Sequence, residues 1–385
     1  MSYAIRVRPE EAGKPFGCRN PNRETFYAHL ESLSCMRVAF VADHTVHHET
    51  VPESAERLDR LAGLLTARGH DVSVLCSQWW EGDVDEFEHD GIEYVAVTDD
   101  PDDWKFPVRV PGALHEVDPE VVHAFGAPSH LAAARVGALG DTAFVSDVFD
   151  APARGVLADR CVRFAAGGGP VVVPARTVAT ALREAGVPAD ALTTLGNPIE
   201  MERIRNTSPG DCGDIVYSRR LDEDANLESL LLALAEFREY DWGATVIGDG
   251  PERENYERQV RDLRIDDRVE FVGEKSVTER IALFKDAHVY VHTARRTTFA
   301  TDLLRALACG CVGIVEYHAQ SSAHELVEQE PRGFLATNDE EITERLVEAA
   351  DIPREDVSER FADHDESAFA ETYLDFYRAG GAGYD

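Results

Sequence analysis

Short apolar runs alternate with amphipathic stretches along the first half of the chain. The run at 36–43 has the composition of a buried strand, and the stretch that follows places Leu58, Leu61 and Leu65 on one face of a helix. Further strands are expected at 70–76, 93–97, 121–124, 142–146 and 170–174. Strands that alternate with helices predict a parallel, doubly wound sheet.

A second series of the same kind begins after 198–212, where Asn206, Pro209 and Gly210 cluster and predict a linker. Strands are expected at 214–218, 243–247, 268–273, 287–292 and 312–315, and helices at 227–239 and 277–286, with two acidic helical stretches after them. The pattern therefore predicts an α/β protein with two Rossmann-like domains.

We place the first domain at 36–205 and the second at 206–360, followed by a helix and tail at 361–385 that could pack on the first domain. Residues 1–35 are polar and irregular, and we treat them as an N-terminal extension, expected to be disordered. The extension is either a flexible tail or the product of a start codon chosen too early. The second interpretation is favoured, because the strand-like run begins at Met36.

The stretch 293–315 predicts one complete unit of a parallel sheet. A loop rich in Arg and Thr follows the strand at 287–292, and a helix then places Leu303, Leu304 and Leu307 on one face. Gly310 is expected to end that helix. Ligands of such folds bind at the loops that follow the strands, so this loop is the first place to look for a site.

Four motifs of this chain resemble motifs of the retaining GT-B glycosyltransferases of group 1, or family 4, and they follow one another along the chain as they do in the family. The segment 306–310 (ALACG) is similar to the family's A-M-A-C-G, 248–251 (GDGP) to its G-D-G-P, and 268–273 (RVEFVG) to its R-V-x-F-L-G. Arg220 and Leu221 match the G-R-L of a further motif. The resemblance spans about 36–380 and implies a GT-B fold, whose two domains face each other across a cleft.

The same alignment shows where the chain departs from the family. The family's pair of glutamates falls on Thr297 and Arg305, its second motif glycine on Ala300, and its lysine on Ala225. An arginine cannot accept a hydrogen bond, so the ribose contact that the family makes through the second glutamate is impossible at Arg305. Arg305 is expected either to form a salt bridge within its domain or to contact a phosphate group.

The resemblance also implies the residues of the site. The expected catalytic residues are Arg220, which would bind the diphosphate, and Asp147. Asp147 and Asp150 could orient an acceptor hydroxyl, and His123 is the other candidate for that role. The donor would be bound by Gly248, Gly273, Lys275, Thr297, Thr298, Phe299, Ala300, Thr301 and Arg305.

Two charged features near the loop leave alternatives open. Arg295, Arg296 and Arg305 are either a cluster for an anionic ligand or solvated surface charge. Asp302 is expected to cap the helix that follows, where its carboxylate would repel an anion. His44, His47 and His48 lack a Cys or carboxylate at metal-ligand spacing, and we expect no metal site there.

Composition limits the partners and the compartment. The formal net charge is -34, from 72 acids against 38 bases, and only four of the bases are lysines. This is typical of halophilic proteins of salt-accumulating archaea, and it argues against nucleic acid as a partner. Seven scattered cysteines without a C-x-x-C pair favour a reducing cytoplasm. No apolar run is long enough to span a membrane, although peripheral contact with one stays open.

The leading hypothesis is a glycosyltransferase, hexosyltransferase-like, that moves a sugar from a UDP- or GDP-linked donor to a hydroxyl of a glycan, lipid or small molecule, with retention and without a cofactor. The alternative is a catalytically impaired, glycosyltransferase-like binding or regulatory partner in glycan assembly. A nucleotide-sugar epimerase on the same fold is a third, weaker hypothesis. The lost glutamates and lysine favour the alternative, and the retained motifs favour the enzyme.

Overall fold

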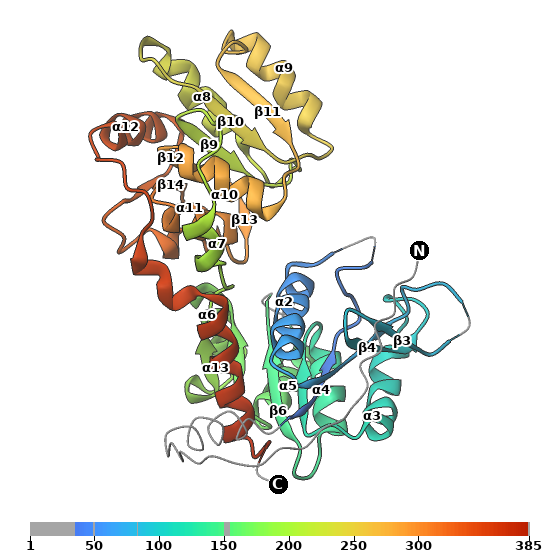
Figure 1. The fold of residues 1–385 in the computed structure, drawn as a ribbon. Helices are drawn as coiled ribbons and strands as arrows, with labels where there is room; N and C mark the ends of the chain where they lie inside the picture. The colour runs from blue at the N-terminus through green and yellow to red at the C-terminus, as the bar shows by residue number, and fades with distance from the viewer. Residues whose placement is uncertain (1–34, 49–50, 83, 150–154, 384–385) are drawn as a thin grey trace, which may run out of the picture. The chain divides into compact units, whose positions relative to one another are not determined.

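The computed structural model describes residues 35–48, 51–82, 84–149 and 155–383 (Figure 1). Expectations for the extension 1–34 and for Asp150 fall outside the described residues. From Met36 onward the chain forms one compact unit, which contains two large parallel sheets.

The first sheet has eight strands in the order β3-β4-β2-β1-β5-β6-β7-β8. All neighbours are parallel except β3, which pairs antiparallel with β4. The strands are β1 (Arg37–Val41), β2 (Asp71–Ser77), β3 (Glu86–His89), β4 (Ile92–Thr98), β5 (Val121–Ala124), β6 (Ala143–Asp147), β7 (Val171–Val173) and β8 (Leu192–Thr194).

Helices cover both faces of this sheet, as a doubly wound fold requires. One face packs against α2 (Glu53–Ala67), whose buried stripe of leucines includes the three expected from the sequence. The other face packs against α3 (Phe106–Val117), α4 (Pro128–Gly137), α5 (Val156–Ala166) and α6 (Arg176–Glu184).

The second sheet has six parallel strands in the order β11-β10-β9-β12-β14-β16. They are β9 (Ile215–Ser218), β10 (Ala244–Ile247), β11 (Val269–Gly273), β12 (Val289–His292), β14 (Val312–Glu316) and β16 (Gly333–Ala336). One face carries α8 (Leu227–Glu236), α9 (Arg253–Leu263) and α12 (Asp339–Ala350), and the other carries α10 (Val277–Asp286) and α11 (Thr301–Ala308). A small ladder of β13 (Arg296–Thr297) and β15 (Gln320–Ser321) lies apart from the sheet.

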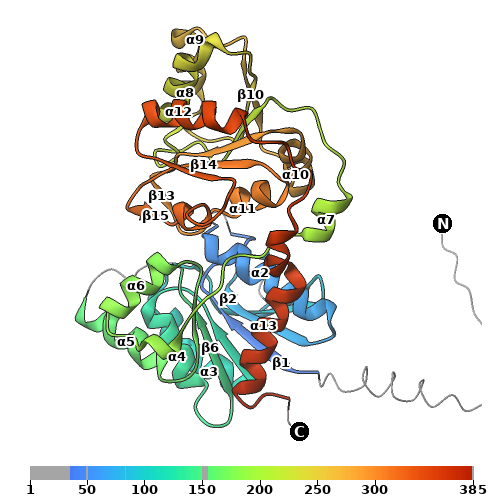
Figure 2. The ribbon, with the colours of Figure 1, turned by 90° about the vertical axis from the view of Figure 1, so that its left-hand side faces the viewer.

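Two crossovers connect the parts of the chain that carry the two sheets. The first runs through the stretch 198–212, where a linker was predicted, and contains the short helix α7 (Met201–Asn206). The second crossover leads into α13 (Glu366–Ala379). A parallel β-bridge between Ile199 and Asp365 joins the two crossovers. α13 lies beside α2 and β6, where Tyr373 and Tyr377 join the core of the first sheet (Figure 2).

The stretch that the sequence singled out folds as expected. β12 leads into a loop, α11 buries Leu303, Leu304 and Leu307, and Gly310 follows the helix with a φ of 90°. This left-handed conformation suits glycine, and a Cβ here would lie 2.0 Å from the Glu355 carbonyl oxygen.

Candidate functional site

The carboxyl ends of β9 and β12 open into a cavity of about 780 Å³. This is the edge of a parallel sheet at which ligands bind. From the second sheet the wall contains side chains with N–H and O–H groups, Arg219, Arg296, Thr297, Thr298, Gln320 and Ser322, together with the carboxylate of Asp224. The facing residues come from the amino end of α2, from Phe149 and from α6.

Arg219 is the first residue after β9, and its side chain is half-buried in this wall. One terminal nitrogen, Nη1, donates to the Thr297 hydroxyl at 3.0 Å. Among the residues that the structure describes, the buried Nε atom of Arg219 has no hydrogen-bond partner. A guanidinium has five N–H donors and stays charged, so Arg219 can still bind an anion while Thr297 holds it.

The hydroxyl of Thr297 also lies 3.1 Å from Nε2 of His292, the last residue of β12. Burial lowers the pKa of His292, the nearby Arg219 charge lowers it further, and the resulting value is about 3. The ring is therefore neutral at physiological pH, and it adds no charge to the wall of the cavity.

The amino end of α11 faces a second cavity of about 230 Å³, which shares Arg219 and Thr297 with the first. No side chain caps this helix, so the expectation that Asp302 would cap it is wrong. The Asp302 carboxylate instead accepts hydrogen bonds from Ser218 at 2.7 Å, from Arg280 at 3.1 Å and from Arg305 at 2.8 Å. These stronger donors draw the carboxylate away from the first turn, whose N–H groups can attract an anion.

Arg305 is buried in a salt bridge. Its Nε and Nη2 atoms donate to the two carboxylate oxygens of Glu200, and Nη1 donates to Asp302. Burial would raise the pKa of Glu200, but Arg305 and Arg60 outweigh burial and lower it to about 2. The bridge to Asp302 is the expected salt bridge within the domain 206–360, whereas the partner Glu200 lies in the part of the chain assigned to the first domain, 36–205.

The two residues expected to be catalytic lie outside both cavities. Arg220 is exposed and lines neither of them, although its neighbour Arg219 lines both. The Asp147 side chain is fully buried, 3.3 Å from Arg57 and 2.6 Å from the hydroxyl of Tyr373, which donates to it. An acceptor therefore cannot reach Asp147 in this conformation, and both catalytic assignments stay predictions.

His123, the alternative to Asp147, has a partner on each ring nitrogen. Nε2 lies 2.8 Å from Asp147 and Nδ1 lies 2.8 Å from the Tyr377 hydroxyl. The ring is therefore a satisfied member of the core.

The predicted donor residues fall into three groups. Thr297 and Thr298 line the larger cavity. The smaller cavity is lined by Thr297, Phe299, Ala300, Thr301 and Arg305. Gly248, Gly273 and Lys275 line neither and lie at the carboxyl ends of β10 and β11.

Gly248 nevertheless shapes the site. It has a φ of 126°, and a Cβ at this position would lie 1.9 Å from the carbonyl oxygen of Arg219. Only glycine permits the end of β10 to approach the backbone of Arg219 so closely. Arg219 itself was missed from the sequence because an adjacent arginine matched the family motif.

The three loop histidines serve local structure in the described part of the chain. Nδ1 of His48 accepts a hydrogen bond from the Thr45 amide at 2.9 Å, and the ring of His47 stacks on Trp79 at 4.0 Å. No group of three or more His, Cys, Asp or Glu side chains in the described residues could hold a metal ion. No helix among them is long and apolar enough to cross a membrane.

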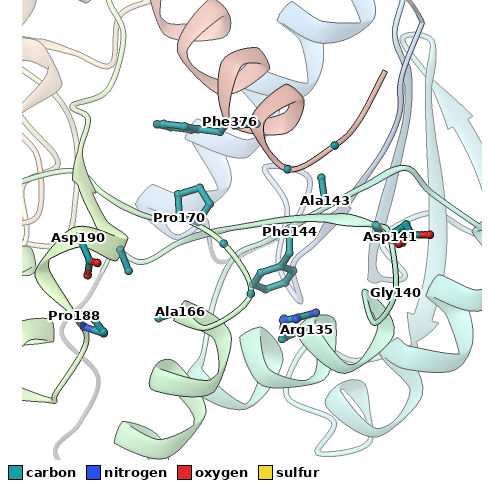
Figure 3. A pocket seen from close by; sticks show the side chains of 17 residues that line it. Arg135, Gly140, Asp141, Ala143, Phe144, Ala166, Pro170, Pro188, Asp190 and Phe376 are labelled. Atoms are coloured by element: carbon teal, nitrogen blue, oxygen red, sulfur yellow. The ribbon is translucent and has the colours of Figure 1, made fainter. Parts of the chain in front are cut away.

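A further cavity of about 960 Å³ lies at the opposite, amino edge of the first sheet (Figure 3). Arg135, Phe144, Pro170 and Phe376 line it, but the Arg135 guanidinium lies over the Phe144 ring and donates to the Ala138 carbonyl. Because its cation is already engaged and parallel sheets bind ligands at the other edge, we place the candidate site at the cavity beside Arg219.

Two family models match successive parts of the chain. Residues 55–203 match the model described as Glycosyltransferase Family 4, and residues 199–362 match Glycosyl transferases group 1. An alpha-monoglucosyldiacylglycerol synthase of Streptococcus pneumoniae is 25% identical over 164 residues. That match covers 41% of this chain and only 37% of the synthase.

Similar solved structures cover nearly the whole chain. A glycosyltransferase from Rickettsia africae has a TM-score of 0.75 at 12% identity, and the match covers 90% of this chain and 98% of that one. The Anabaena protein HepE, in complex with UDP and glucose, has a TM-score of 0.66 at 15% identity, with 89% and 100% covered. Sucrose-phosphate synthase from Thermosynechococcus elongatus has a TM-score of 0.68 at 17% identity, and the match covers 89% of this chain and 98% of that one. These likenesses show the fold, and the GT-B prediction is confirmed.

Proposed function

Because the chain belongs to the group 1, family 4 glycosyltransferases, we propose that it transfers a hexosyl group from a nucleotide sugar to an acceptor hydroxyl, with retention. The donor diphosphate would occupy the cavity beside Arg219. The bond between the sugar and the diphosphate breaks with its electron pair going to the diphosphate oxygen, the acceptor oxygen bonds to the sugar, and the proton of the acceptor hydroxyl leaves with the diphosphate.

The observation that carries this proposal is the position of Arg219. Its guanidinium borders the cavity next to a second cation, Arg296, and its Nε atom is buried without a hydrogen-bond partner among the described residues. Negative charge develops on the diphosphate as the sugar leaves, and fixed cations stabilise such charge most effectively in a site that excludes water. The volume of about 780 Å³ lies within the usual range for small-molecule sites.

The two ion pairs of the Asp302 carboxylate support the same proposal. Arg280 and Arg305 both donate to its carboxylate, so it no longer repels a phosphate from the amino end of α11. Donors of this kind need no metal ion, and we propose a metal-independent reaction. UDP is the first nucleotide to test, because HepE was solved in complex with UDP.

The setting of the reaction is also proposed. The six cysteines in the described part of the chain are all free, which fits a reducing cytoplasm. The excess of 72 acids over 38 bases fits work at molar salt. Binding should therefore be measured in about 3 M KCl.

The second candidate function is that of a nucleotide-binding partner without catalysis. The specific observation that favours it is Arg305, whose donors are taken up by Glu200 and Asp302 at the position where the family has a glutamate. A donor would then lack that carboxylate contact. Both candidate functions require that the chain binds the nucleotide, and only the transferase should turn over a nucleotide sugar.

Titration calorimetry with UDP and UDP-glucose tests the proposal, and the two adjacent arginines provide matched variants. Arg219→Ala removes a charge-assisted contact and should weaken UDP binding about 10- to 150-fold. Arg220→Ala removes the same charge outside the cavity and should change the affinity less than twofold. If Arg220→Ala has the larger effect, the assignment from the sequence motif is right and ours is wrong.

Turnover separates the two functions. Release of UDP from UDP-glucose, followed with a panel of hydroxyl acceptors, identifies a transferase. Tight binding of UDP without any release supports the non-catalytic partner. If the wild-type chain binds neither nucleotide, both candidates fail.

A further inference from the structure

Three side chains from separate loops and strands form a chain of contacts in the wall of the cavity: His292, Thr297 and Arg219. We propose that His292 and Thr297 are positioning residues that hold the Arg219 guanidinium ready for the diphosphate of the donor. The inference rests on the proposed function and assigns roles to two residues that do not themselves need to touch the ligand.

The Thr297 hydroxyl is the centre of the arrangement. It lies 2.8 Å from the Arg296 carbonyl oxygen, to which it donates, 3.0 Å from Arg219 Nη1 and 3.1 Å from His292 Nε2. A threonine hydroxyl has one proton and two lone pairs. The carbonyl at 2.8 Å is the closer acceptor for this proton than Nε2 at 3.1 Å, and with the proton on the carbonyl the two lone pairs accept from Arg219 and from His292.

This assignment of the proton requires one tautomer of His292. To donate to Thr297, the ring must carry its proton on Nε2, and a neutral ring then has none on Nδ1. Three nearby groups change the pKa of His292 in addition to burial. Arg219 and His318 lower it, and Asp302 raises it. Burial of the ring adds to the effect of Arg219, so His292 remains a neutral donor.

The residue types at positions 219 and 297 complement each other. The resemblance described from the sequence puts the glycine of the family's G-R-L motif on Arg219 and one of its glutamates on Thr297. A glutamate 3 Å from Arg219 would form an ion pair and neutralise it. A threonine accepts only one of the five N–H groups and brings no charge, so the guanidinium is held in place and keeps its charge.

The held guanidinium explains why positioning matters for affinity. An arginine side chain that is free to rotate loses that freedom when it binds, and this loss reduces affinity. In this chain Thr297 limits the rotation before the ligand arrives. We therefore expect removal of the Thr297 hydroxyl to weaken only the part of binding that depends on the diphosphate.

The test compares variants of Thr297 with UDP and uridine as probes. Thr297→Val keeps the shape, removes the hydroxyl and should weaken UDP binding about 3- to 10-fold, with uridine unchanged. Thr297→Ser restores the hydroxyl and should recover the wild-type affinity within twofold. Thr297→Glu should weaken UDP binding at least as much as Arg219→Ala, because a carboxylate then pairs with the cation.

A double variant distinguishes positioning from a merely structural role. In an Arg219→Ala background, Thr297→Val should have no further effect on UDP binding, because there is no guanidinium left to hold. The inference is overturned if Thr297→Val weakens UDP and uridine equally, or if its effect is as large without Arg219 as with it.

A measurement without ligand separates this inference from the proposed function. In a chain labelled with ¹⁵N-histidine, nuclear magnetic resonance should show His292 neutral with its proton on Nε2 from pH 5.5 to 8. A charged ring, or a proton on Nδ1, overturns the inference even if the chain binds UDP. If instead the chain binds no UDP and the ring is as expected, the proposed function fails while the contacts among the three side chains stand.

Discussion

Arg305 holds both carboxylate oxygens of Glu200, with donor–acceptor distances of 2.9 and 3.0 Å, although the two residues are 105 positions apart. Glu200 directly precedes α7 on the first crossover, and its carboxylate also lies 2.6 Å from Arg60 of α2. One buried carboxylate therefore connects α11 to the crossover and to a helix of the first sheet. The arginine at position 305 takes part in the packing of the chain where the family pattern has a glutamate.

Reversal of this charge should destabilise the protein. Arg305→Glu would place a third carboxylate beside Glu200 and Asp302 and should lower the free energy of unfolding by about 3–5 kcal/mol. Denaturant unfolding at fixed KCl measures this loss. The matched control is Arg305→Glu combined with Glu200→Arg, which restores an ion pair and should recover much of the stability. An unchanged midpoint for the single variant would contradict the role given to the pair.

Acid should release the same contact. The pKa of Glu200 is about 2 in the folded protein because Arg305 and Arg60 outweigh burial, which acts in the opposite direction. The folded-state pKa lies below the ordinary value of 4.5. The carboxylate therefore stabilises the fold fully above pH 4.5, and this contribution of about 3 kcal/mol is lost as the pH falls toward 2.

Unfolding measured from pH 6 to pH 3 in wild type and in Glu200→Gln tests this. The variant has no carboxylate to protonate, so its stability should fall less steeply below pH 4.5. Parallel curves for the two proteins would show that Glu200 does not titrate as the contacts require.

A second buried network gives a test within α13. The Tyr373 hydroxyl accepts from Arg57 at 3.0 Å and 2.6 Å and donates to Asp147 at 2.6 Å. Tyr373→Phe should therefore lower stability by about 2–4 kcal/mol, because two buried charged groups lose a partner. The hydroxyl of Tyr377 lies 2.8 Å from His123, a neutral partner, and Tyr377→Phe should lower stability by about 1 kcal/mol.

Calorimetric unfolding measures both variants, and UDP titration measures whether the site is affected. Neither tyrosine lines the candidate cavity, so UDP affinity should not change. A larger loss for Tyr377→Phe than for Tyr373→Phe would contradict the importance given to the charged network.

The fold could be predicted from the sequence because buried parallel strands are nearly continuous apolar runs and their helices carry regular apolar stripes. Strands that were not expected from the sequence lack a clear apolar run, as β3 and β16 illustrate. β3 has the sequence EFEH and is exposed at the edge of its sheet, so its hydrophobic pattern is weak. β16 has the sequence GFLA and is only partly buried, and so short an apolar run does not distinguish a strand from a helix.

The site was harder to predict, because side-chain direction and distant partners decide it. Arg219 and Arg220 are adjacent at the end of a strand, and the sequence does not reveal which one faces the cavity. The presence of an arginine at 305 was visible, but its partner Glu200 lies on another element. The burial of Asp147 depends on α13, which is more than 200 residues away in the chain.

The last prediction concerns salt. The chain has 72 acids and 38 bases, so acidic side chains repel one another over most distances at low ionic strength. The Debye length is roughly 10 Å at 0.1 M salt and roughly 3 Å at 1 M, so molar KCl removes most of this repulsion between exposed groups. Buried pairs such as Arg305 and Glu200 are screened much less. The melting temperature should therefore rise between 0.1 M and 3 M KCl, and it should rise by a similar amount in Arg305→Gln, whose lost contact is buried. Equal melting temperatures at the two salt concentrations would show that the acid excess is not an adaptation to salt, and a rise confined to the wild type would place the salt effect in the buried pair.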